Sequence, residues 1–229
     1  MELSKRLASV VSLVREGALV ADVGTDHGYV PIYLAQTGVS RHIIAMDVNP
    51  GPLMRASEHI GEHGLGDMIE TRLSDGLKGL KEGEADTMIA AGMGGGLVIR
   101  ILRESPEIVR GIQEFILQPQ SEIHKVRDYL NRSGFRLTEE RMTEEDGKFY
   151  PVMKWRHGEE PAYSEPELYY GRRLLADRDL VLYRFLVKEE GRMDAIYQGL
   201  KNQPGEAVRF RCEEIERELG RIRQTLDMY

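Results

Sequence analysis

The sequence has 229 residues, of which 41% are hydrophobic and 30% charged, and its 31 Lys and Arg against 38 Asp and Glu give a formal net charge of −7. This composition is typical of soluble globular proteins, and the length suits one domain with a smaller appendage. No apolar stretch approaches the roughly 20 residues of a membrane-spanning helix, the N-terminus does not resemble a signal peptide, and the single cysteine excludes an internal disulfide or a cysteine-cluster metal site. We therefore expect a cytoplasmic protein. The acidic total also argues, at first, against a nucleic-acid partner.

Short apolar runs alternate with segments of helical spacing over the first 155 or so residues. The predicted strands are 18–21, 42–46, 68–73, 87–91 and 115–117, followed by an antiparallel pair at 135–143 and 149–155. The predicted helices are 3–14, 30–36, 53–63, a segment ending at 103, and 121–131. Continuous apolar strands between amphipathic helices indicate an α/β fold with a mostly parallel sheet that helices cover on both faces.

The composition changes after residue 155. Residues 157–166 contain two Glu-Pro pairs and predict a linker, and beyond them apolar residues recur with heptad spacing in two runs joined by a Pro-Gly turn at 204–205. Arg172, Asp179 and Glu189 interrupt the first run. We expect one domain over residues 1–157 and an antiparallel helical hairpin of coiled-coil type over 158–229.

A glycine-rich loop follows the first predicted strand. Residues 22–28 read Asp-Val-Gly-Thr-Asp-His-Gly, the alternation of a D-x-G-x-G-x-G loop with Asp26 in place of the middle glycine. Such glycines let a backbone approach a ligand closely, although a plain strand-to-helix turn would also use them. Asp47 ends the next strand, 25 residues after Asp22, where a carboxylate can accept hydrogen bonds from ribose hydroxyls. Together these features favour a nucleoside site.

The acidic loop favours S-adenosylmethionine over a dinucleotide. Asp26 would repel a pyrophosphate, whereas Asp22 or Asp26 can pair with the ammonium group of S-adenosylmethionine. Asp75 closes the third strand in a Ser-Asp-Gly turn and can accept from the adenine amino group, although the same sequence is common in turns. The run Gly92-Met93-Gly94-Gly95-Gly96 closes the fourth strand, where a flat backbone could admit a planar base and Met93 could contact it.

These motifs resemble those of one family. The loop and its continuation to Pro31, with Ser74-Asp75-Gly76, the segment 91–95 and Leu117-Gln118-Pro119, resemble the bacterial TrmK family. Its members are S-adenosylmethionine-dependent methyltransferases that modify N1 of adenine 22 in tRNA. The resemblance covers essentially the whole chain and departs at Gln120, where we expect Asn. It implies a Rossmann-like methyltransferase domain of seven strands, followed by a helical domain that helps to hold tRNA.

The motifs and the resemblance together define the candidate site residues. The expected cofactor-binding residues are Asp22, Gly24, Thr25, Asp26, Gly28, Asp47, Val48, Asn49, Asp75, Gly76, Leu77, Gly92, Met93 and Gly94. The expected substrate-binding residues are His27, Gly95, Gln118, Pro119, Arg172 and Arg173, and the expected catalytic residues are Asp26 and Tyr29.

The roles of three loop residues stay open at this point. Asp26 either accepts the proton that the methylated base loses or anchors the cofactor ammonium. Tyr29 either stacks on the target base or packs under the loop, and His27 either donates to the substrate or caps the following helix. Adenine N1 attacks through its own lone pair, so Cys212 is expected to pack in the hairpin, and no metal is expected.

Two other functions share the same loop: methylation of a small molecule, and non-catalytic binding of a nucleoside with the hairpin as a dimerisation arm. A NAD-dependent oxidoreductase is disfavoured by Asp26. The hairpin, about a third of the chain, favours tRNA because it adds no obvious pocket for a small molecule. We expect a monomer or a weak homodimer.

The charge is unevenly distributed along the chain. Residues 1–160 contain 19 basic and 25 acidic residues, whereas 161–229 contain 12 basic and 13 acidic residues. Arginines gather at 172–184, where they form either a solvated face or a contact surface for tRNA phosphates. The total charge therefore does not exclude tRNA, but it predicts local and salt-sensitive binding.

Overall fold

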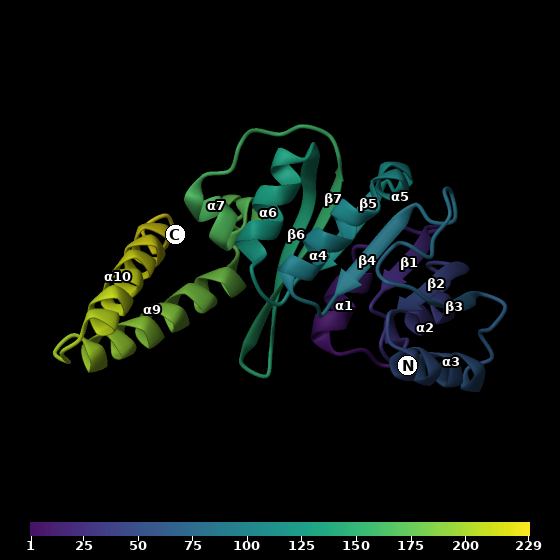
Figure 1. Ribbon diagram of the computed structural model, residues 1–229, viewed down its shortest axis with the longest axis horizontal. Helices are drawn as coiled ribbons and strands as arrows, with labels where there is room; N and C mark the ends of the chain where they lie inside the picture. Colours follow the sequence, from purple (N-terminus) through teal and green to yellow (C-terminus); the bar gives the residue numbers. More distant parts are fainter. The chain divides into compact units, whose positions relative to one another are not determined.

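Seven strands form one sheet in the computed structural model, which describes all 229 residues, and they lie in the order β3-β2-β1-β4-β5-β7-β6 (Figure 1). The strands are β1 (Leu19–Val23), β2 (His42–Asp47), β3 (Ile69–Leu73), β4 (Thr87–Ala91), β5 (Glu114–Gln118), β6 (Phe135–Glu145) and β7 (Lys148–His157). The first five are parallel, and β7 runs antiparallel to both β5 and β6. The predicted mostly parallel, seven-stranded sheet is confirmed.

Six helices accompany this sheet: α1 (Lys5–Val11), α2 (Tyr29–Gln36), α3 (Pro50–Glu62), α4 (Gly95–Glu104), α5 (Pro106–Gly111) and α6 (Ile123–Arg132). Two separate buried clusters mark the two faces of the sheet, one with residues of α1, α2 and α3 and the other with residues of α4, α5 and α6. Within β4, Met88 and Ala90 belong to one cluster and Ile89 to the other. The continuous apolar strands therefore reflect burial on both faces. The short helix α5 has no counterpart in the sequence-based prediction.

The order of the strands reverses between β1 and β4. Val23, the last residue of β1, pairs with Met46 of β2 on one side and Ala90 of β4 on the other. The chain runs from β1 outward to β2 and β3 and then returns to β4, which leaves a crevice beyond the carboxyl ends of β1 and β4. In doubly wound sheets this is the place where ligands bind.

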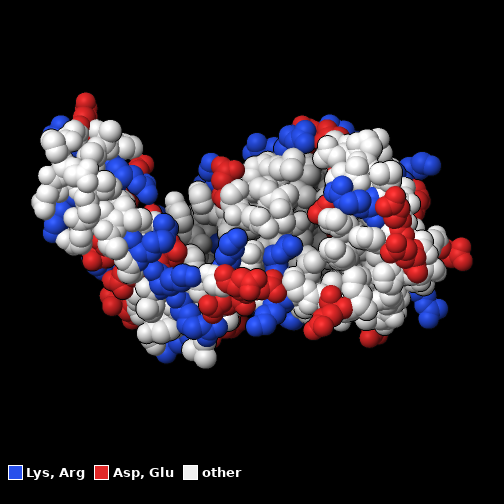
Figure 2. All heavy atoms as spheres, turned by 90° about the horizontal axis from the view of Figure 1, so that it is seen from below, with Lys and Arg blue, Asp and Glu red and all other residues white.

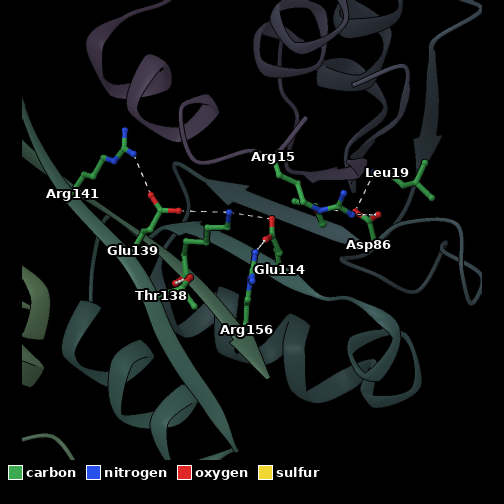
Figure 3. A network of polar contacts seen from close by, with 10 residues as sticks. Arg15, Leu19, Asp86, Glu114, Thr138, Glu139, Arg141 and Arg156 are labelled. Atoms are coloured by element: carbon green, nitrogen blue, oxygen red, sulfur yellow. Dashed lines mark hydrogen bonds and ion pairs between the residues drawn. The ribbon is translucent and has the colours of Figure 1, made fainter. Parts of the chain in front are cut away.

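Charged side chains at the other end of the strands, away from the crevice, are paired with one another (Figure 3). Glu114, at the start of β5, is 1% exposed and forms ion pairs with Arg156 and with Lys154 Nζ, which lies 3.2 Å away. Lys154 Nζ also lies 3.7 Å from Glu139. Because a buried carboxylate is costly without a cation, these contacts stabilise the join between the parallel strands and the β6–β7 pair.

The chain divides into two compact units, Met1–Tyr163 and Ser164–Tyr229. The segment just after β7, part of the predicted linker 157–166 and of the domain expected to begin at 158, belongs to the first unit instead. Glu160 Oε1 accepts hydrogen bonds from the backbone N–H of Leu137 at 3.0 Å and from the hydroxyl of Tyr163 at 2.8 Å. Tyr163 in turn stacks on Trp155, with ring centroids 6.1 Å apart. These contacts place the boundary between the units six residues beyond the expected one.

The second unit consists of four helices: α7 (Glu165–Tyr170), α8 (Arg172–Ala176), α9 (Leu180–Leu200) and α10 (Glu206–Leu226). Helices α9 and α10 pack against each other and form the predicted antiparallel hairpin. Their buried seam consists of Leu182, Leu186 and Met193 from α9 and Ile215, Leu219 and Ile222 from α10. None of the helices in either unit is long and apolar enough to cross a membrane.

The first heptad run does not form one continuous helix. The chain breaks at Gly171, with φ 100°, and again at Arg178, with φ 49°. Asp179 then begins α9, because its carboxylate accepts from the backbone N–H groups of Val181 and Leu182, each at 2.8 Å. The interruptions of the apolar pattern at 172 and 179 are therefore helix boundaries rather than imperfections of a seam.

Candidate cofactor and substrate site

A cavity of about 430 Å³ opens beyond the carboxyl ends of β1 and β4. It lies in the crevice where the strand order reverses, and all of its lining residues belong to the first unit. The lining consists of Glu2, Leu3, Ser4, Arg6, Leu7, Asp22, Gly24, Thr25, Asp26, His27, Tyr29, Val30, Ala91, Gly92 and Gln120. The cavity therefore brings together the glycine loop and the end of β4.

The glycine loop has a left-handed backbone at every second residue. Gly24, Asp26 and Gly28 have φ angles of 78°, 49° and 73°. Aspartate tolerates this region better than most side chains do, so Asp26 keeps the backbone of the glycine that it replaces and adds a carboxylate. A Cβ on Gly24 would lie 2.9 Å from Met93 Cε. The absence of a side chain therefore lets the end of β4 lie close to the loop.

Asp22 is buried in the cavity wall without a cationic partner. It is 4% exposed, and burial raises the pKa of its carboxyl to about 6, with the Thr25 hydroxyl opposing this change and the charge of Asp47 adding to it. A buried carboxylate of this kind favours a positively charged ligand, since a nearby cation stabilises its ionised form.

Three aromatic rings cluster close to Asp26 with their planes nearly parallel. The ring of His27 lies 5.4 Å from Tyr29 and 5.7 Å from His59 between centroids, with interplanar angles of 15° and 19°. His59 Nδ1 also contacts the backbone oxygen of His27 at 3.0 Å, so α3 supports the loop from outside. Arg55 Nη2, also on α3, donates to Asp26 Oδ1 at 3.3 Å.

The geometry excludes one of the two alternative roles of His27 and one of those of Tyr29. Gly28 is the N-cap of α2, and no side chain caps that helix, so His27 does not act as its cap. Tyr29 is 42% exposed and stacks on His27, so it does not pack beneath the loop.

The carboxyl ends of β2 and β3 carry the other predicted cofactor residues. Asp47 is buried, and its Oδ1 accepts from the backbone N–H of Asn49 at 2.8 Å. Val48 is exposed, and Asn49 begins α3 without a side-chain capping bond. These residues leave one Asp47 oxygen and the Asn49 amide for a ligand.

Asp75 is already paired, with Lys78 Nζ at 2.8 Å and Arg100 Nη2 at 2.9 Å, and hydrogen bonds from these two cations hold its pKa below the ordinary value. Gly76, with φ 62°, has Ile101 against its Cα, so a Cβ there would lie 2.8 Å from that side chain. Leu77 is fully buried in the core. Only the backbone of Leu77 could therefore contact a cofactor. The Asp75 carboxylate could bind one only while it also remains paired with Lys78 and Arg100.

The glycines after β4 serve two different purposes. Gly92, with φ 84°, lines the cavity, and a Cβ there would face Arg6 and Gln120 at 3.5 and 3.8 Å. Gly95 is buried, and its Cβ would lie 2.5 Å from the backbone oxygen of Ser121. Gly94 and Gly96 are likewise close to the 121–122 segment. Most of this run therefore allows α4 to pack against the start of α6, and only Gly92 opens space in the cavity.

Gln118 and Pro119, predicted to contact the substrate, are both buried at the end of β5. Gln118 Oε1 accepts from the backbone N–H of Gly92 at 3.1 Å and from Arg6 Nη1 at 3.0 Å. Gln118 thus joins the end of β4 to α1.

The candidate site residues predicted from the sequence include none from the N-terminal segment. Five of its residues line the cavity, among them Arg6. The helical spacing of 3–14 indicated only a helix that packs on the sheet, and nothing in that pattern indicates which sheet edge its polar side chains reach.

Comparison with known proteins shows the family of this chain. Residues 3–153 match the family model of a methyltransferase domain. The tRNA (adenine(22)-N(1))-methyltransferase of Bacillus subtilis is 36% identical over 162 residues, which cover 71% of this chain and 68% of that protein. The chain belongs to the TrmK family of tRNA (adenine(22)-N(1))-methyltransferases.

Solved structures of TrmK relatives extend the likeness to nearly the whole chain. The Bacillus subtilis TrmK structure has a TM-score of 0.86 and 28% identity and covers 98% of this chain and 99% of its own. A Streptococcus pneumoniae protein described as a tRNA (m1A22) methyltransferase, in complex with S-adenosyl-L-methionine, has a TM-score of 0.88 and 30% identity, with 98% and 100% coverage.

Several basic residues of the second unit of this TrmK chain form ion pairs with acids. Arg172 is half-buried, and its Nε lies 2.7 Å from Glu167, a contact that ties α8 to α7. Arg173, by contrast, is exposed. On α10, three arginines form ion pairs, Arg211 with Glu214, Arg221 with Glu165 and Arg223 with Glu190. Figure 2 shows basic and acidic side chains interspersed on the face that it displays.

The position of the cysteine and the possible metal-binding side chains bear on the reaction that the cavity could support. Cys212 is free and half-buried on α10, within the second unit and outside the cavity lining. The structure contains no group of three or more His, Cys, Asp or Glu side chains that could hold a metal ion.

Proposed function

We propose that this protein transfers the methyl group of S-adenosylmethionine to N1 of adenine 22 in tRNA. The observation that carries the proposal is Asp22, a buried acid without a cationic partner, in a cavity formed by the glycine loop and the end of β4. Membership of the TrmK family supplies the substrate and the position of the methylated base.

The residues around the cavity fit S-adenosylmethionine. Asp22 would accept hydrogen bonds from its ammonium group, and the backbone at Gly24 leaves room for close approach because no Cβ is present. Asp47 would bind the ribose through its free oxygen, with Val48 and Asn49 beside it. When bound, the cofactor supplies a methyl group on a sulfonium, which makes that carbon electrophilic.

The residues near Asp26 fit the acceptor side of the reaction. Adenine N1 carries an in-plane lone pair, so it forms the new N–CH₃ bond without an enzyme nucleophile, while the methyl–sulfur bond breaks and its electron pair stays on the sulfur of the leaving group, S-adenosylhomocysteine. The methylated ring is cationic until its amino group loses a proton. The Asp26 carboxylate stabilises that charge and accepts the proton, while the exposed ring of Tyr29 offers a stacking surface for a base that has left its own stack.

The second unit is proposed to bind tRNA. TrmK relatives match nearly the whole chain, so these helices are part of the likeness to tRNA methyltransferases. Arg172 and Arg173 are the residues of this unit proposed to contact phosphates, and Arg173 is the more exposed of the two. A monomer or weak homodimer, and a cytoplasmic location, remain predictions.

Transfer of radiolabel from S-adenosylmethionine to unmodified tRNA tests the proposal. We expect label in tRNA, and we expect the Asp26→Asn variant to slow transfer by at least about tenfold. Asp146→Asn is the matched control, because Asp146 also has a left-handed backbone, with φ 50°, and lies in the β6–β7 turn. Label in small molecules alone, or cofactor binding without transfer, would favour one of the two competing functions.

A further inference from the structure

Arg6 stands out among the cavity residues because its positive charge has no acidic partner. The side chain is half-buried, its Nη1 donates to the neutral Gln118 Oε1 at 3.0 Å, and its guanidinium lies 5.8 Å from the centre of the Tyr150 ring. Glu145 accepts hydrogen bonds from the backbone N–H groups of Lys5 and Arg6 instead. Most of the five N–H donors of the guanidinium therefore have no protein acceptor.

The acids in the same cavity do not neutralise Arg6. Glu2, Asp22 and Asp26 all line the cavity, yet none lies within the 4.0 Å of an ion pair with its guanidinium. A half-buried cation without a counter-charge is unfavourable, so the site is complementary to an anionic ligand.

Gln118 provides a second, independent observation. It is 1% exposed, and its Oε1 accepts from two donors, Arg6 Nη1 and the Gly92 N–H. Because both neighbours are donors, the orientation of the amide is determined, and its Nε2 has no partner in the protein. A buried donor of this kind normally has an acceptor. Two adjacent side chains, Arg6 and Gln118, thus each carry N–H donors without an acceptor.

We infer that Arg6, held by Gln118, is an oxyanion-binding residue of this cavity, an inference that rests on the proposed function. The planar guanidinium matches a carboxylate or a phosphate with two parallel hydrogen bonds. Two ligands of the proposed reaction carry such a group: the carboxylate at the methionine end of the cofactor, and a phosphodiester of the tRNA next to the target base. Arg6 and Asp22 in one cavity would together match an amino acid that carries both charges.

Binding measurements with Arg6→Gln distinguish these two sources. The probes are S-adenosylhomocysteine, 5′-methylthioadenosine, which lacks the amino-acid end, and unmodified tRNA. If Arg6 binds the carboxylate, the variant binds S-adenosylhomocysteine at least about tenfold more weakly while its affinity for methylthioadenosine is unchanged. If Arg6 binds a phosphate, the affinity for tRNA falls by a similar factor, and the slope of its salt dependence decreases by about one.

Arg41→Gln is the matched control, because Arg41 is exposed and lies just before β2, outside the cavity lining. Arg6→Lys keeps the charge and should recover only part of the lost affinity. Unchanged affinity of Arg6→Gln for both charged probes overturns the inference, and so does an equal loss for methylthioadenosine, which would indicate a general disturbance of the cavity. If the wild-type protein binds neither S-adenosylhomocysteine nor tRNA, the proposed function fails together with the inference.

Discussion

Replacing Asp22 with Asn tests the electrostatics of the site in the absence of any ligand. The wild-type carboxyl is buried, and its pKa is about 6, compared with the ordinary value of 3.8. At 1.36 kcal/mol for each pKa unit, this difference corresponds to about 3 kcal/mol. Asn has nearly the same shape but never ionises, so the substitution removes the cost of burying a charge.

The sign of the effect follows from the raised pKa. Folding favours the protonated form of Asp22, so its stabilising contribution is complete below about 3.8 and is lost as the pH rises through about 6. We therefore expect Asp22→Asn to unfold with nearly the same free energy as the wild type at pH 4. At pH 7.5 it should be more stable, by up to about 3 kcal/mol.

Urea denaturation of the ligand-free proteins at pH 4, 5, 6 and 7.5 measures this difference. Asp67→Asn is the control, because Asp67 is exposed and its replacement should change stability little at any pH. A second measurement connects Asp22 to function: binding of S-adenosylhomocysteine should weaken below about pH 6 in the wild type, and the Asn variant should lose this dependence. A stability difference that does not vary with pH, or an Asn variant that is less stable at pH 7.5, would refute the reasoning.

Two further predictions follow from close contacts. Gly24→Ala and Gly38→Ala both force alanine into a left-handed backbone, with φ 78° and 74°, and each should lower the free energy of unfolding by about 1–2 kcal/mol. Only Gly24→Ala should also weaken the binding of S-adenosylhomocysteine measured by calorimetry, because its Cβ would lie 2.9 Å from Met93 Cε. Arg127→Met leaves the buried Glu140, which Arg127 Nη2 contacts at 2.9 Å, without that cation, and urea denaturation should show a loss of about 3 kcal/mol. Adding Glu140→Leu should restore part of this loss, and a double variant less stable than the single one would contradict that account.

The sequence was sufficient for the sheet and for the glycine loop. Strands such as 87–91 were predictable because burial on both faces requires a continuous apolar run, and β4 has these bounds. The loop was predictable because Asp26 is one of the few side chains that can replace a glycine at positive φ, and it has φ 49°. In both places local chemistry and the final fold impose the same requirement.

Contacts between distant segments were not predictable in the same way. Arg6 and Gln118 are 112 positions apart and meet only in the folded chain. Gly95 was predicted to contact the substrate, but its lack of a side chain instead allows close packing against Ser121. The sequence shows that a residue is small or charged, but the residue that it contacts depends on which elements the fold brings together.

The second unit shows what heptad spacing can and cannot predict. Heptad spacing correctly indicated the hairpin of α9 and α10, since their buried residues follow it. It also continued through α7 and α8, where the chain turns twice. Spacing alone could not separate an interrupted seam from two short helices followed by a long one, although a charged residue at a seam position was the available signal. Arg172 marks one such break and pairs with Glu167.

Mapping the methylated nucleotide tests the central claim most directly. Unmodified tRNA is incubated with the protein and S-adenosylmethionine, and the product is analysed by nucleoside mass spectrometry and by primer extension, which N1-methyladenosine arrests. The account predicts N1-methyladenosine at position 22 and no transfer to a tRNA in which guanosine replaces adenosine 22. Methylation at another position, at the adenine amino group instead of N1, or equally of the guanosine variant would contradict it.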